Sequence, residues 1–132
     1  MYSLIRFIAS EVPSASEQAI LASVRQVLDQ ELRRKSTPPG PHRYRRVDCP
    51  VSEENKWDAH LLEVKAFLRA YSGIIRQASQ GGLRVVLQAT LYSSDIAGDK
   101  QYVCLTVCFD REVLSLLAEL AMDLDVCAYA VG

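Results

Sequence analysis

Residues 57–82 read WDAHLLEVKAFLRAYSGIIRQASQGG, and this stretch sets the organisation of the chain. Its large apolar residues recur at alternating intervals of four and three, the spacing of one face of a helix. They are Trp57, Leu61, Val64, Leu68, Tyr71, Ile75 and Ala78. The pair Gly81-Gly82 follows, and glycine commonly ends helices because it tolerates left-handed backbone. The stretch predicts a long amphipathic helix that stops at the glycine pair.

The N-terminal residues predict a strand and then a helix. Residues 2–9 are rich in β-branched and aromatic side chains, which favour a strand. Ser14 and Glu17 have the spacing of a capping box, in which the two side chains satisfy free amides at a helix start. An apolar stripe over residues 20–32 extends this helix, which we expect to end near Lys35.

Between the two predicted helices lie a loop and an edge strand. Residues 36–41 hold three prolines and a glycine, which predict an exposed loop. Residues 42–47 alternate basic and apolar side chains and predict an edge strand, whereas residues 48–56 have an irregular pattern.

The C-terminal part predicts three strands and a helix. Residues 83–92 and 102–109 are strand-like, and the polar residues 93–101 would join them as a hairpin. Asp110 is a suitable N-cap for a third helix, and residues 126–131 form the last strand.

The order β-α-β-α-β-β-α-β predicts an α+β fold. We expect a mostly antiparallel sheet of about five strands with three helices packed on one face. The chain has 132 residues, which fits a single domain spanning residues 1–132.

Composition excludes several classes of protein. The formal net charge is −1, so the chain as a whole has no electrostatic attraction to nucleic acid or an anionic membrane. The N-terminus lacks the pattern of a signal peptide, and no apolar run approaches the roughly 18 residues of a membrane span. The four cysteines show no CxxC spacing, which favours reduced thiols. We therefore expect a cytoplasmic protein without contact to a membrane.

The sequence also lacks motifs that carry chemistry. It has no Gly-x-Ser-x-Gly elbow and no phosphate-binding glycine loop. His60 and Glu63 are three apart on a predicted helix, but no second pair of ligands accompanies them, so a metal site is not expected. We expect no catalytic residues, no metal and no cofactor, and hence a protein that is not an enzyme.

Two surfaces are candidates for binding a partner. Alternate residues of a strand face opposite sides of a sheet, so the side without helices would carry several tyrosines, or would simply face water. These tyrosines are Tyr92, Tyr102 and Tyr129. The second candidate is the basic segment 33–46, which carries no acid and whose central residues are Arg43, Tyr44, Arg45 and Arg46. It could neutralise the acidic residues 48–63, hold an acidic protein, or contact nucleic acid.

The second half of the chain resembles a bacterial family of unknown function. The shared features are Trp57 opening a long helix, the stop at Gly81-Gly82, two strands, the step Phe109-Asp110 into a helix, the turn Asp123-Leu124-Asp125, and an aromatic strand with Tyr129. The resemblance covers roughly residues 57–131 and implies a small bacterial cytosolic protein without a catalytic signature.

Many proteins of that kind are immunity proteins, which bind and block a toxin. We therefore expect a non-enzymatic protein-binding domain that neutralises a cognate toxin, as a monomer or homodimer. The alternative is a nucleic-acid-binding regulator that uses residues 33–46, and binding to nucleic acid is the less expected of the two.

Overall fold

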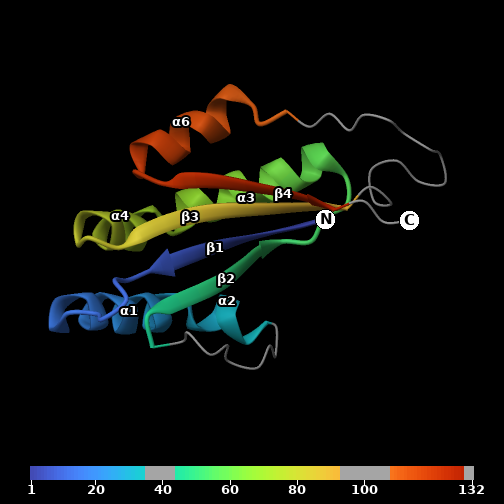
Figure 1. Cartoon of the computed structure of the whole chain (residues 1–132). Helices are drawn as coiled ribbons and strands as arrows, with labels where there is room; N and C mark the ends of the chain where they lie inside the picture. Colours follow the sequence, from blue (N-terminus) through green and yellow to red (C-terminus); the bar gives the residue numbers. More distant parts are fainter. Residues whose placement is uncertain (35–43, 93–107, 130–132) are drawn as a thin grey trace.

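A computed structural model describes residues 1–34, 44–92 and 108–129, and the account below concerns these ranges (Figure 1). They form four strands and five helices in an α+β arrangement. The elements in chain order are β1 (Tyr2–Ile8), α1 (Ala15–Val27), α2 (Asp29–Arg33), β2 (Arg46–Ser52), α3 (Trp57–Ala70), α4 (Ser72–Gln80), β3 (Arg84–Tyr92), α6 (Arg111–Glu119) and β4 (Asp123–Tyr129). No described helix is long and apolar enough to cross a membrane.

The four strands form one mixed sheet in the order β2-β1-β3-β4. β1 lies in the middle and runs antiparallel to both β2 and β3, whereas β3 and β4 are parallel. A parallel pair needs a crossover connection, and α6 lies on the connection between β3 and β4. Two of the three strand pairs are antiparallel as predicted, whereas the parallel β3–β4 pair makes the described sheet a mixed one, with four strands.

The structure has five described helices and not the three predicted, because two of the predicted helices are each divided into two. The chain leaves helical geometry at Leu28, between α1 and α2, and at Tyr71, between α3 and α4. Leu28 is fully buried, and Tyr71 packs partly buried against the core. The apolar periodicity continues across both breaks because each helix pair keeps one face on the same core, so the pattern did not reveal the breaks.

Strand boundaries also differ from the prediction. β2 covers Arg46–Ser52, so part of the segment expected to be irregular is strand, and residues 44–45 form a turn. The pattern misled because Pro50 and Asp48 disfavour strands, yet a proline is tolerated on an edge strand such as β2.

β4 begins at Asp123, so the expected Asp-Leu-Asp turn is strand. Its carboxylates are tolerated because both are exposed at the sheet edge. Cys108 and Phe109, expected at the end of a strand, lie outside any strand, and residues 102–107 lie outside the described residues.

Local capping signals are confirmed. Ser14 and Glu17 form a capping box at the start of α1. Asp110 caps α6, since its Oδ1 accepts a hydrogen bond from the Val113 amide at 2.9 Å. Gly81 follows α4, and Gly82 has a positive φ of 93°.

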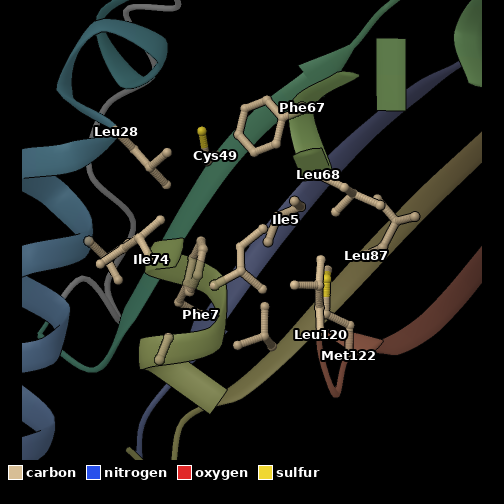
Figure 2. Close-up of a cluster of buried hydrophobic side chains, with 14 of the residues drawn as sticks. Ile5, Phe7, Leu28, Cys49, Phe67, Leu68, Ile74, Leu87, Leu120 and Met122 are labelled. Atoms are coloured by element: carbon tan, nitrogen blue, oxygen red, sulfur yellow. The ribbon is translucent and has the colours of Figure 1, made fainter. Parts of the chain in front are cut away.

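The core lies between the sheet and the helices, which cover one face of the sheet (Figure 1). Figure 2 shows Ile5 and Phe7 from β1 and Leu87 from β3 among side chains from the helices. All three are fully buried, whereas the neighbouring residues Leu4 and Ile8 are only partly buried and do not belong to this cluster. None of the described helices covers the opposite side of the sheet, although Val86 and Thr90, which lie on that side of β3, are each only 1% exposed.

Candidate interaction surface

The sheet side opposite the helices is termed the open face, and strand pairing arranges its side chains in cross-strand rows. β1 contributes Tyr2, Leu4, Arg6 and Ile8, because their neighbours Ser3, Ile5 and Phe7 point towards the helices. In the sheet register Leu4 lies opposite Pro50 of β2 and Gln88 of β3, and Gln88 lies opposite Asp125 of β4.

Three tyrosines gather at one end of the open face. Tyr92 and Tyr129 are register partners, and their rings stack with centroids 5.7 Å apart and an angle of 25°. Tyr2 extends the row, with its ring 6.4 Å from that of Tyr92. We call Tyr2, Tyr92 and Tyr129 the tyrosine row. Tyr129 is 54% exposed, so the row presents aromatic surface at the edge of the sheet.

The other end of the open face is charged. Asp48 lies between two arginines, with its Oδ1 3.5 Å from Arg6 Nε and 3.2 Å from Arg46 Nε. Arg84 Nε donates to Asp123 Oδ2 at 2.8 Å, and this hydrogen bond with the adjacent carboxylate raises the pKa of the Arg84 guanidinium. Opposite charges therefore pair within the face, which gives this end little net charge.

Ion pairs also account for much of the basic segment. Arg33 Nε is 3.0 Å from Asp29, and Arg34 Nη1 is 3.2 Å from Glu31, both within α2 or at its end. With Arg46 beside Asp48, three of the segment's described arginines have a carboxylate within ion-pair distance.

The predicted site residues fall into separate groups. Tyr92 and Tyr129 come together in the tyrosine row, and Arg46 lies on the same face near its far end. Tyr44 is exposed in the turn before β2. Arg45 lies in the same turn, and its backbone carbonyl accepts a hydrogen bond from the Ala9 amide at 2.8 Å. Arg43 and Tyr102 lie outside the described residues.

Sequence reasoning missed Tyr2. The alternation of β1 assigns Tyr2 to the same side as Arg6, but it does not say which strands flank β1. Only the order β2-β1-β3-β4 brings Tyr2 beside Tyr92, about 90 residues along the chain.

His60 is sealed in the interior. Its Nδ1 lies 2.9 Å from the Glu54 carbonyl and its Nε2 lies 2.5 Å from Ser3 Oγ. Because a carbonyl can only accept, Nδ1 carries the proton and the Ser3 hydroxyl donates to Nε2. Burial lowers the pKa of His60 below its usual 6.5, which favours this neutral ring.

The Ser3–His60 pair has the hydrogen bond of a serine nucleophile and its base, but a substrate cannot reach the serine. The two residues are 2% and 1% exposed, and the ring stacks on Trp57 at 5.6 Å. A catalytic serine must meet its substrate, so this pair acts as a structural link between β1 and α3. Among the residues with described positions, no group of three or more side chains could hold a metal ion.

Comparison with known proteins identifies no relative of this chain. No family model, no curated protein and no solved structure matches this chain. The candidate surface therefore stands on geometry alone.

Proposed function

We propose that this chain is a non-enzymatic protein-binding domain, a bacterial immunity protein that binds and neutralises a cognate toxin. The observation that carries the proposal is the tyrosine row on the open face of the sheet. Tyrosine is enriched in protein interfaces because it offers a large amphipathic area and loses little conformational entropy on binding. The toxin as partner comes from the family resemblance of residues 57–131.

The ordering of the face supports a binding role. Tyr92 is held between two other rings, and the arginines of the charged end are held by carboxylates. A surface whose side chains are already fixed loses less entropy when a partner docks. The Ser3–His60 pair does not give comparable support for an enzyme, because both residues are buried.

Nucleic-acid binding by residues 33–46 is the weaker candidate. Arg33, Arg34 and Arg46 each have a carboxylate within ion-pair distance. A phosphate would have to compete with these carboxylates, and the net charge of −1 offers no long-range attraction.

The proposal is tested by affinity capture from a bacterial lysate, followed by purification of the captured protein. An immunity protein should form a complex of fixed stoichiometry with one protein that is toxic when expressed alone, and co-expression of this chain should restore growth. Tyr129→Ala should weaken the complex at least about tenfold, as expected of an aromatic anchor. Arg45→Glu is the control on the basic segment.

Each outcome is decisive for the surface. Loss of binding in Arg45→Glu with full binding in Tyr129→Ala would move the interface to the basic segment. Recovery of nucleic acid alone, with affinity that falls steeply as salt rises, would replace the proposal with the alternative. A captured protein that is harmless to cells would refute the immunity role.

A further inference from the structure

The two edges of the sheet differ in how they are protected. An edge strand exposes unpaired amides and carbonyls, and proteins commonly block it with proline, bulges or a covering element. β2 has Pro50, a register shift opposite Ser3 and Leu4, and contacts from α1, α2 and α3. This edge is blocked against a further strand.

β4, at the other edge of the described sheet, has no proline and no register shift, and its only charged residues are Asp123 and Asp125. It pairs with β3 in unbroken register over seven residues, from Val86 with Asp123 to Tyr92 with Tyr129. Its sequence from Asp123 to Tyr129 has neither proline nor lysine. Side chains on both of its faces are exposed, with Val126 at 47% on the helix side and Tyr129 at 54% on the open face.

The chemistry of β4 differs between its two faces. Asp123 and Asp125 project on the open face with Tyr129, since these residues are an even number apart. Leu124, Val126 and Ala128 project on the other side. Arg84 forms an ion pair with Asp123 and also interacts electrostatically with Asp125, whose neighbour in the sheet register is the neutral Gln88.

We propose that the β4 edge binds an extended basic segment of the protein partner by strand addition. The inference rests on the proposed function and names the partner's chemistry. Residues of the added strand that lie beside Asp123 and Asp125 would be lysine or arginine, because cross-strand neighbours of opposite charge attract. Residues beside Val126 would be apolar, so the segment alternates basic and apolar side chains. A cation near the end of the strand would lie over the exposed ring of Tyr129.

Charge argues against a second copy of this chain as the occupant. In a fully overlapping antiparallel pair of two β4 strands, Asp123 would lie opposite Tyr129 and Asp125 opposite Cys127 of the other copy, so neither carboxylate would gain a cation. A basic strand instead gains attraction at the same positions.

The test uses a defined probe and the full chain. The probe is a seven-residue peptide that alternates arginine and valine, with blocked ends and a fluorescent label. Its controls are an acidic twin with glutamate for arginine, and a version with alternate backbone amides methylated. Fluorescence anisotropy measures affinity, and hydrogen exchange reports on the amides of residues 123–129.

We expect the basic probe to bind and the acidic and methylated probes not to bind. Asp125→Lys should weaken binding at least about tenfold, because it replaces an attraction by a repulsion. Asp125→Asn should weaken it less. Glu11→Lys makes the same change of net charge at an exposed turn residue and should leave affinity within about twofold. Bound probe should slow exchange at amides of β4.

Several results would overturn the inference. Equal binding of the methylated probe would mean charge attraction without strand pairing. Full protection of all β4 amides in the free protein would mean that the edge is already occupied, and a homodimer through β4 in sedimentation would make a second copy the occupant. If the captured partner is lost in Tyr129→Ala but kept in Asp125→Lys, the inference fails while the proposed function stands. If no toxin is captured, the proposed function fails while the probe still decides the inference.

Discussion

The hydrogen bond between Ser3 and His60 gives the most direct quantitative test of the structure. Ser3→Ala removes the donor and leaves the buried Nε2 of His60 without a partner, which should cost about 1–2 kcal/mol of unfolding free energy. His60→Phe keeps a ring beside Trp57 but leaves the Ser3 hydroxyl and the Glu54 carbonyl unpaired. That variant should cost about 2–4 kcal/mol.

The double variant separates this hydrogen bond from general damage. With Ser3 and His60 both replaced, neither partner of the bond is left unsatisfied. The double variant should therefore be less destabilised than the sum of the single variants, by about 1–2 kcal/mol. Urea unfolding followed by far-UV circular dichroism measures each free energy without relying on Trp57, whose ring stacks on His60.

The same residue predicts a dependence on pH. Burial lowers the pKa of His60 in the folded protein below 6.5, so the unfolded chain binds the proton more readily. The neutral ring therefore contributes stability that is present above pH 6.5 and is lost as the pH falls through the folded pKa. The stability difference between the natural protein and His60→Phe should shrink over that range. Additive costs, within about 0.5 kcal/mol, together with a constant difference between the two proteins, would refute the buried pair.

Three further predictions concern other parts of the fold. Burial raises the pKa of the Cys49 thiol to about 12, so iodoacetamide at pH 8 should label the exposed Cys108 long before Cys49, as followed by peptide mass spectrometry. Gly82→Ala should cost about 1 kcal/mol in urea unfolding, because Gly82 has a φ of 93° that alanine disfavours. Lys65→Met should lower the melting temperature by several degrees, since the Lys65 ammonium lies 2.6 Å from Asp110 and 3.1 Å from Glu112 and joins α3 to the start of α6. Lys65→Arg, which keeps the charge, should lower it less.

Short-range signals in the sequence predicted the starts of α1 and α6 well. The pairs Ser14 with Glu17 and Asp110 with Val113 lie three residues apart, so the residues that make each cap are visible together in the chain. The breaks at Leu28 and Tyr71 were not visible, because they keep the same residues on the core. The end of β4 nearest α6 was missed because Asp123 and Asp125 disfavour strands, and their exposure at the edge is a property of the sheet.

The candidate surface could be predicted in part. Alternation in residues 83–92 predicts that Tyr92 and Val85 point to opposite sides, and Val85 is indeed buried in the core. Alternation does not give strand order, and the pairing of Tyr92 with both Tyr2 and Tyr129 depends on that order. It also does not reveal that Arg33 and Arg34 pair with acids of their own helix.

The central position of β1 has a consequence for how the chain folds. Residues 2–8 are synthesised before residues 46–52 and 84–92, with which they pair. β1 cannot form both of its strand pairs until about 90 residues have been synthesised, and contacts so distant in sequence slow folding. While it waits, the nascent segment exposes an aromatic and β-branched strand in which Arg6 is the one charged residue. A charge within an apolar strand disfavours aggregation of an exposed segment, and in the folded sheet Arg6 lies between Asp48 and Val86.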